Sequence, residues 1–281
     1  VGDLQGNMWK VDISSANPTH WSATVLFKAK DSSGNPQPIT TAPAVSLHPL
    51  YPAKQGYMVY FGTGRFLGPT DIPDGTTTPQ TETFYGVWDQ PSTSNGNTSA
   101  LTRSSLVAQT LSVANLTTPI FNGQTQVRLL TSNSIDWNTK SGWYIDFDVP
   151  SGTGERIITN PVLDSGRVIF TTFIPAAAGD ICTGGGTSWL MTVNYSNGGA
   201  FPSPEFDLNN DGNLNIQDKV NGSNPVGLPL GDGLASGTTV VKGGPGANQH
   251  TKLVSRSNGE ISTVHERGGT VTGRVSWRQL Q

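Results

Sequence analysis

The stretch Met58-Val59-Tyr60-Phe61-Gly62-Thr63 decides the fold. A degenerate copy of it follows later in the chain, as Arg167-Val168-Ile169-Phe170-Thr171-Thr172. A shorter segment precedes each copy, Ala42-Pro43-Ala44-Val45 in the first case and Asn160-Pro161-Val162-Leu163 in the second. A third strand-like segment follows each copy after a loop: Phe84-Tyr85-Gly86-Val87-Trp88 and Trp189-Leu190-Met191-Thr192-Val193. Three strands in one order are typical of propeller blades, whose sheets each bury a face against the next. A β-sandwich with similar turn spacing is the alternative.

The composition indicates an all-β chain. Charged residues make up only 13%, whereas the chain has 34 Gly and 19 Pro. Gly, Pro or Asn-Gly interrupts nearly every stretch longer than about ten residues, which excludes long helices. Segments rich in β-branched and aromatic residues predict strands over 7–13, 24–28, 57–62, 83–88, 126–130, 143–149, 168–173 and 189–195. Loops are expected over 68–81, 91–100, 176–187 and roughly 200–250.

We expect residues 1–281 to form a single modified β-propeller domain. A weaker third copy of the repeat begins at Asn224-Pro225-Val226-Gly227. The sequence has no initiator Met and no signal peptide, and it starts within a motif, at Val1-Gly2-Asp3. It is therefore expected to be part of a longer polypeptide.

Several partners are excluded by charge and hydropathy. The formal net charge is −3, and Lys and Arg are scattered, so the chain lacks the cationic surface that nucleic acid requires. No apolar run is long enough for a membrane-spanning segment.

The one cysteine, Cys182, cannot form an internal disulfide, so we interpret it as a small buried residue, with pairing to a segment outside this sequence as the alternative.

Residues 207–218 read Asp-Leu-Asn-Asn-Asp-Gly-Asn-Leu-Asn-Ile-Gln-Asp and predict a calcium-binding loop. Ca²⁺ takes six to eight oxygen ligands, and a chain that wraps around the ion presents alternate side chains inward. The predicted ligands are Asp207, Asn209, Asp211, the carbonyl of Asn213, Asn215 directly or through water, and Asp218. Gly212 permits the positive φ that reverses the chain, and Leu214 is expected to enter the core.

The surroundings of this loop exclude the long flanking helices of an EF-hand. Pro202 and Pro204 precede it, and Gly222 and Pro225 follow it, so the loop is an insertion at about 200–225 in a β scaffold. Three carboxylates and two Asn predict moderate affinity, between the range of calcium sensors and roughly 10⁻⁴ M. The similar stretch 71–75 lacks alternating ligands, and we interpret it as a turn.

Five blocks resemble the PilY1 family of type IV pilus tip adhesins. They are Gly2-Asp3-Leu4-Gln5-Gly6-Asn7-Met8-Trp9-Lys10-Val11-Asp12, Val59-Tyr60-Phe61-Gly62-Thr63-Gly64-Arg65-Phe66-Leu67, Phe84-Tyr85-Gly86-Val87-Trp88-Asp89, Cys182-Thr183-Gly184-Gly185-Gly186-Thr187-Ser188-Trp189-Leu190 and Arg274-Val275-Ser276-Trp277-Arg278-Gln279-Leu280. Their shared order along most of the chain carries the resemblance. The family motif for calcium ends in Asp at its ninth position, where this sequence has Asn215.

The resemblance implies a modified β-propeller at the tip of type IV pili, acting in pilus biogenesis, adhesion and twitching motility, and through these in surface sensing and virulence. It also implies a calcium site that controls whether pili extend or retract. The implied partners are minor pilins or other pilus tip components and a host or abiotic surface. The implied location is the extracellular cell surface, at the pilus tip (fimbrium), or in association with the outer membrane.

Two rival functions remain open. The first block also resembles the blades of quinoprotein (PQQ-type) dehydrogenases, and the calcium loop resembles half of a dockerin. Quinoprotein dehydrogenases usually have a vicinal Cys pair, whereas this sequence has a single Cys. Dockerins have two calcium loops, each with a helix, whereas this sequence has one loop. For these reasons we expect neither an enzyme nor a dockerin. We therefore predict no catalytic and no cofactor-binding residues apart from the Ca²⁺ ligands. Four histidines are interpreted as isolated surface or turn residues: His20, His48, His250 and His265.

The expected mechanism is ordering of residues 200–225 by calcium. Binding would cancel the repulsion among three carboxylates and dock Leu214 and Ile216 onto the scaffold, shifting a population between two states. The charged pairs Glu155-Arg156 and Glu266-Arg267 are interpreted as solvated turns.

Overall fold

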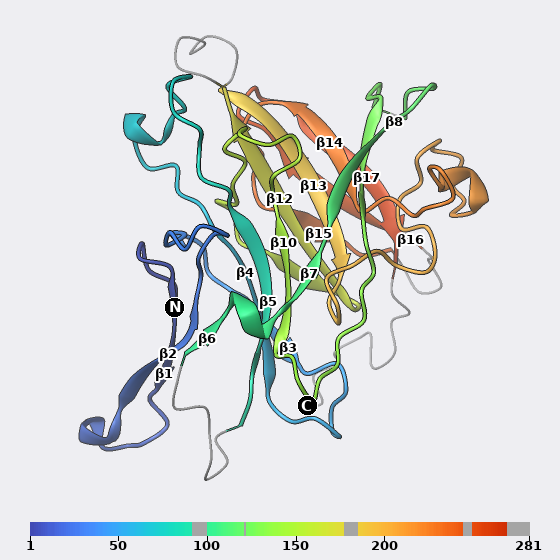
Figure 1. Ribbon diagram of the computed structural model, residues 1–281. Helices are drawn as coiled ribbons and strands as arrows, with labels where there is room; N and C mark the ends of the chain where they lie inside the picture. The colour runs from blue at the N-terminus through green and yellow to red at the C-terminus, as the bar shows by residue number, and fades with distance from the viewer. Residues whose placement is uncertain (92–99, 121, 177–184, 244–248, 269–281) are drawn as a thin grey trace, which may run out of the picture.

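The computed structural model describes residues 1–91, 100–120, 122–176, 185–243 and 249–268. These residues form seventeen β-strands and four short 3-10 helices, and no α-helix occurs among them. The strands make four sheets (Figure 1). The all-β prediction is therefore confirmed for the described residues. In the same part of the chain, no helix has the length and apolar character that crossing a membrane requires.

The first two sheets come mainly from the N-terminal half. The first has the strand order β1 (Asn7–Asp12), β2 (Ser22–Lys28), β6 (Leu101–Thr102). The second has the order β3 (Ala44–Leu47), β4 (Tyr57–Gly62), β5 (Thr83–Asp89), β10 (Gly142–Asp146), β7 (Val107–Gln109). Pairing is antiparallel except between β2 and β6 and between β10 and β7.

The other two sheets complete the stack. The third has the order β11 (Val162–Asp164), β12 (Arg167–Pro175), β13 (Gly186–Asn194), β14 (Gly227–Asp232), β9 (Gln126–Leu130), β8 (Leu111–Asn115). The fourth has the order β15 (Thr239–Val241), β16 (Gln249–Ser255), β17 (Ile261–Arg267). The 3-10 helices are η1 (Pro18–His20), η2 (Pro69–Asp71), η3 (Arg103–Ser105) and η4 (Ile216–Asp218).

The two main copies of the sequence repeat are confirmed as structural units. Strands β3, β4 and β5 pair antiparallel in that order, as do β11, β12 and β13. The third copy, expected to begin at Asn224, is wrong, because β14 pairs with β13 and extends the existing third sheet. Eight predicted strands correspond to β1, β2, β4, β5, β9, β10, β12 and β13.

Successive sheets pack face to face because their central strands are apolar on both sides. On β5, Tyr85 belongs to the core shared with the first sheet, whereas Phe84 belongs to the core shared with the third. On β12, Phe170 faces the second sheet and Ile169 lies in the core shared with the fourth. The rings of Phe84 and Phe170 stack with centroids 4.0 Å apart and planes 9° apart. Alternate residues of a strand point to opposite faces, so a strand buried on both sides reads as continuously apolar.

The loop predicted over roughly 200–250 is wrong in its second half, which contains β14, β15 and the start of β16. These strands are short or rich in Gly, Pro and Thr, so their sequences lack a clear apolar alternation. The loop over 68–81 is confirmed apart from the single turn η2. Most of 91–100 and 176–187, with Cys182, lies outside the described residues, as does the block at 274–280.

The interpretation of Glu155-Arg156 as a solvated turn is wrong. Glu155 is 1% exposed, and its carboxylate makes two hydrogen bonds of 2.5 Å with the guanidinium of Arg128 on β9. The side chain of Arg128 is also fully buried, and its guanidinium lies over the ring of Trp189 at 4.1 Å. The partner lies 27 residues away in sequence, so local sequence could not reveal the pair.

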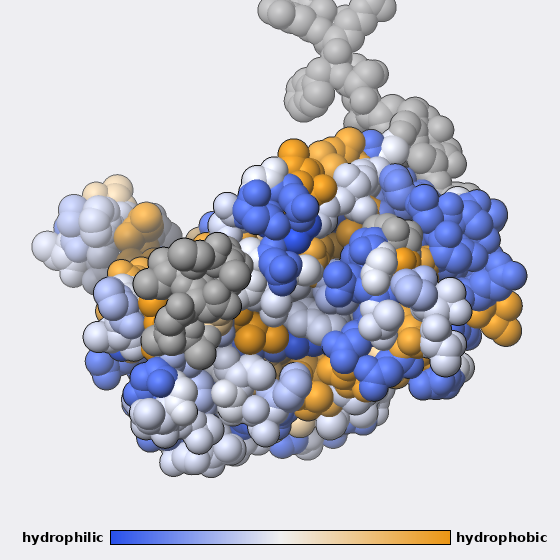
Figure 2. All heavy atoms as spheres, turned by 90° about the horizontal axis from the view of Figure 1, so that it is seen from above, coloured by the Kyte–Doolittle hydropathy of each residue, from blue (hydrophilic) through white to orange (hydrophobic). Residues whose placement is uncertain are grey.

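The surface itself mixes hydrophilic and hydrophobic residues on the face seen in Figure 2.

We predict that Phe170→Ala lowers the free energy of unfolding by about 3–5 kcal/mol, because the substitution leaves a cavity between two sheets. Ile216→Ala serves as the control, since Ile216 is 79% exposed, and should change stability by less than about 0.5 kcal/mol. Urea unfolding followed by tryptophan fluorescence measures both. Equal effects of the two substitutions would contradict the stacking of β5 on β12.

Candidate metal centre

The candidate calcium loop lies in the connection between β13 and β14. The chain enters it along β17, where Phe206 forms a β-bridge with Glu266. The N–H of Asp207 donates to the carbonyl of His265 at 3.3 Å, and the N–H of Arg267 donates to the carbonyl of Glu205 at 2.7 Å. The loop therefore starts from a backbone position that another sheet fixes.

The first half of the loop wraps around the carboxylate of Asp207. Its Oδ1 accepts a hydrogen bond from the N–H of Asp211 at 3.1 Å, and its Oδ2 accepts one from the N–H of Gly212 at 2.8 Å. The predicted positive φ of Gly212 is confirmed at 81°, a conformation that glycine adopts without steric cost. Asn209 and Asp211 are exposed to solvent. Oδ1 of Asn209 accepts a hydrogen bond from the N–H of Asp211 at 3.1 Å.

The second half of the loop is closed by Asp218. Its Oδ1 accepts from the N–H of Leu208 at 2.8 Å, and its Oδ2 accepts from the N–H of Asn215 at 2.8 Å. Oδ1 of Asn215 accepts from the N–H of Gln217 at 2.7 Å and caps η4. The amide of Asn213 donates to the carbonyl of Asp211 at 3.2 Å. η4 spans a single turn, and the described residues of this connection contain no α-helix, as the flanking prolines predict.

Burial makes this loop unusual electrostatically. Asp207 is 2% exposed and Asp218 is fully buried, yet no Lys, Arg or His of the described residues forms an ion pair with Asp207, Asp211 or Asp218. Burial, and then the charges of Asp207 and Asp211, raise the pKa of Asp218. A buried carboxylate is costly without a cation, and an all-oxygen donor set suits Ca²⁺. The donor chemistry therefore fits calcium, although no three His, Cys, Asp or Glu side chains of the described chain already converge into a metal cluster.

The expectation that Leu214 enters the core is wrong, whereas the docking of Ile216 on calcium binding stays a prediction. Ile216 is 79% exposed and Leu214 is only half-buried. Leu208 and Val220 instead enter the core shared by the third and fourth sheets, at 5% and 7% exposure. These two residues flank the exposed middle of the loop, so both of its ends are fixed to the scaffold.

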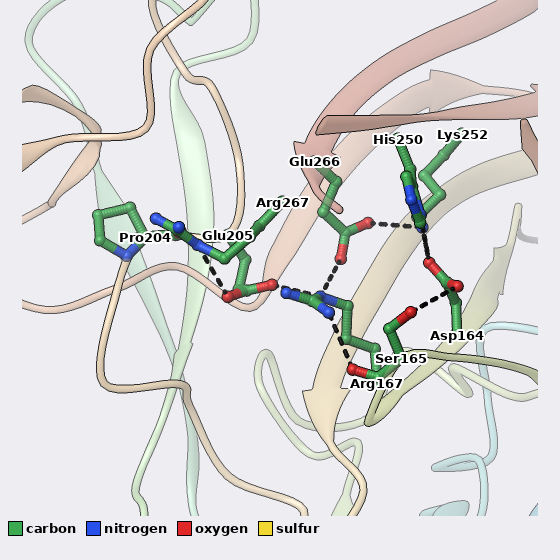
Figure 3. Close-up of polar contacts among 9 residues, drawn as sticks. All are labelled: Asp164, Ser165, Arg167, Pro204, Glu205, His250, Lys252, Glu266 and Arg267. Atoms are coloured by element: carbon green, nitrogen blue, oxygen red, sulfur yellow. Dashed lines mark hydrogen bonds and ion pairs between the residues drawn. The ribbon is translucent and has the colours of Figure 1, made fainter. Parts of the chain in front are cut away.

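A buried ion cluster lies beside the loop entry (Figure 3). Arg167 of β12 approaches Glu205 at 2.5 Å and Glu266 at 3.9 Å. Lys252 of β16 lies 3.6 Å from Glu266 and 3.3 Å from Asp164. The side chains of all five residues are at most 6% exposed. The cluster therefore joins β11 and β12 to the β16–β17 hairpin and to the loop entry.

Two sequence interpretations fail in this cluster. Glu266-Arg267 is not a solvated turn, because Glu266 is fully buried and Arg267 approaches Glu205 at 3.6 Å. His250 is 2% exposed, and its Nδ1 lies 2.7 Å from Oδ2 of Asp164. Outside this cluster, His48 is also buried, in contact with Trp88 and Trp137. Burial alternates along 249–255 and 261–267, but the sequence carries no clear signal of it, because the inward positions hold His250, Lys252 and Glu266.

The cluster shifts the ionisation of its carboxyl groups in different directions. Burial raises the pKa of Glu266 to about 7, although the charge of Lys252 opposes the shift. Burial likewise raises the pKa of Glu205 against the charge of Arg167. Burial would also raise the pKa of Asp164, but the hydrogen bond from His250 and the charge of Lys252 outweigh it and lower that pKa.

The cluster does not have the geometry of a nucleophilic triad. The hydroxyl of Ser165 donates to Asp164 at 3.2 Å, so the carboxylate stands between the serine and His250. A triad needs the base beside the nucleophile.

A second polar feature lines a cavity of about 630 Å³ between the 36–38 and 65–82 segments. Glu82 is 7% exposed there, and its Oε2 has no hydrogen-bond partner in the part of the chain that the structure describes. Burial raises the pKa of Glu82 to about 7, with the charge of Arg156 opposing the shift. Residues 71–74 border the same cavity, and the carboxylate of Asp74 accepts hydrogen bonds from the N–H groups of Thr76 and Thr77. The interpretation of 71–75 as a turn is therefore confirmed.

We predict that Glu82 makes the protein less stable as pH rises. A carboxyl group whose folded pKa is raised binds a proton more tightly in the folded state, so stability is greatest below about pH 4.5 and falls until about pH 7. Glu82→Gln should remove this loss and stabilise the protein at pH 8 by on the order of 2–3 kcal/mol. Urea unfolding at a series of pH values measures the free energy of unfolding of both proteins, with Glu260→Gln as the control at an exposed carboxylate. A pH dependence unchanged by Glu82→Gln would contradict the assignment.

The fold and the loop define a class of protein: an all-β domain of stacked sheets with an acidic loop inserted between two strands of one sheet. Residues 1–123 match the PilY1 beta-propeller domain model. A type IV pilus biogenesis factor PilY1 homolog of Xylella fastidiosa is 32% identical over 209 aligned positions, covering 70% of this chain and 13% of that protein. The type IV pilus biogenesis factor PilY1 of Pseudomonas aeruginosa PAO1 is 30% identical over 320 aligned positions, covering 100% of this chain and 26% of that protein.

The same relationship holds in three dimensions. The crystal structure of the Pseudomonas aeruginosa PilY1 C-terminal domain matches with a TM-score of 0.74 at 26% identity, covering 94% of this chain and 56% of that chain. The chain belongs to the PilY1 family and has the fold of its C-terminal propeller domain. It spans 13% to 26% of the length of these two relatives. Their names describe biogenesis factors, and neither describes an enzyme.

Proposed function

We propose that this chain is the calcium-binding domain of a type IV pilus biogenesis factor and tip-associated adhesin. One observation supports the calcium part most strongly: Asp207 and Asp218 are buried without an ion pair to any cation of the described chain. Similarity to biogenesis factors over the whole chain supports the pilus part. The proposed location is the cell surface at the pilus tip, and the proposed partners are minor pilins and a host or abiotic surface.

Calcium, when bound, would supply the positive charge that this loop lacks. Asp207, Asp211 and Asp218 would hold it together with Asn209 and the carbonyl of Asn213, with Asn215 binding directly or through water. Because Leu208 and Val220 already fix both ends of the loop, the ion would act on the exposed middle, residues 209–217. An ordered middle segment would offer one surface to another pilus component and a loosened one would withdraw it, which shifts pili between extension and retraction.

We expect Asp207→Ala and Asp211→Ala each to weaken calcium binding at least tenfold, because each removes a carboxylate ligand. Isothermal titration calorimetry on the purified domain measures the binding, and twitching zones and surface piliation of the bacterium measure the consequence. Asp74→Ala is the matched control, since Asp74 also caps an exposed turn but lies outside the candidate site.

The two parts of the proposal fail separately. Undiminished affinity in both loop variants would refute the assignment of the site. Lost affinity combined with normal twitching and piliation would refute calcium control of pilus dynamics.

A further inference from the structure

The candidate calcium loop is fastened to the β16–β17 hairpin at both its entry and its tip. At the entry, Phe206 bridges Glu266 and the N–H of Asp207 donates to His265. At the tip, Nε2 of Gln249 on β16 donates to the carbonyl of Gly212 at 3.2 Å. A single hairpin therefore contacts the first and the sixth positions of the loop.

We propose that calcium binding and ordering of the β16–β17 hairpin are coupled, and that Glu205, Arg167 and Glu266 are positioning residues for the ligand Asp207. This inference rests on the proposed calcium site. It names the element of the fold that the ion controls, and the residues that hold the site ready without touching the ion.

Glu205 fixes the backbone immediately before Asp207. Its carboxylate is 2% exposed and lies between two arginines, with Arg167 at 2.5 Å and Arg267 at 3.6 Å. Nε of Arg267 also donates to the carbonyl of Pro204 at 3.0 Å. The three residues before Asp207 are therefore held by side chains of β12 and β17 as well as by the backbone bridge. A ligand held in place before binding loses less conformational entropy when the ion arrives.

Glu266 connects this entry to the core of the hairpin. It follows His265, whose carbonyl accepts a hydrogen bond from the N–H of Asp207. Both carboxylate oxygens of Glu266 are buried without a hydrogen bond to any described residue. Its only close cations in the described chain are Lys252 at 3.6 Å and Arg167 at 3.9 Å. Removing one member of a buried ion cluster leaves the others uncompensated, so such a cluster forms or separates as a unit. Displacing the hairpin would therefore also release the loop entry.

Coupling of this kind acts in both directions. If calcium fixes Gly212 and Asp207, it also fixes two groups that contact the hairpin. If the hairpin is ordered, it presents Asp207 in the position that the ion needs. Linkage requires the two effects to have equal free energy.

Hydrogen–deuterium exchange of the purified domain with and without about 5 mM CaCl₂ tests the inference. This concentration is roughly fiftyfold above the weakest expected Kd of roughly 10⁻⁴ M. Calcium should slow exchange of the hairpin amides in 249–255 and 261–267 by roughly fivefold or more, the lower end of typical coupling. Calorimetry supplies the reciprocal measurement. Gln249→Ala, which removes a single surface contact and leaves the ion cluster intact, should weaken calcium binding roughly threefold to tenfold, and Glu266→Gln should weaken it at least as much.

Arg103→Met is the matched control, because Arg103 forms an ion pair with Asp146 in the second sheet, away from the loop. It should leave calcium affinity within about twofold of the wild type. Calcium binding with unchanged hairpin exchange and full affinity in Gln249→Ala would overturn this inference alone. Absence of calcium binding to the wild type would overturn the proposed function and, with it, this inference.

Discussion

Two buried carboxylates that pair with no cation among the described residues are the constraint on which the proposed function depends. Asp207 and Asp218 close the two ends of one twelve-residue loop and are almost inaccessible to water. Backbone N–H groups satisfy their oxygens, but N–H groups do not neutralise their charge. A fold that buries two like charges so close together gains stability when a hard cation joins them. The proposed calcium dependence follows from this electrostatic imbalance.

The scaffold explains why such a loop is tolerated. Three apolar cores separate four sheets, and the central strands contribute residues to two cores at once. The loop and the residues that flank it contribute Phe206, Leu208 and Val220 to the core between the third and fourth sheets. The charged middle of the loop can therefore stay at the surface, because the residues at its two ends are packed in the core. The ion cluster of Figure 3 adds a polar connection between the same elements.

The sequence predicted what local patterns control. The strand repeat and the positive φ of Gly212 follow from residue spacing and backbone sterics, and both are present. It could not predict the partners of Arg128 or His250, because these ion pairs join residues far apart in the chain. Reading Glu266 as a solvated charge failed for the same reason. Residues 207–218 lie in a connection between strands, but Leu208 rather than Leu214 enters the core, because tertiary packing decides which apolar residue turns inward.

A crystal structure of this domain grown with millimolar CaCl₂ would test the central claim most directly. The account predicts electron density for one ion inside the loop, with six to eight oxygens at about 2.3–2.6 Å, carboxylates of Asp207 and Asp211 among them. A fully ordered loop with water or nothing at that position would contradict it.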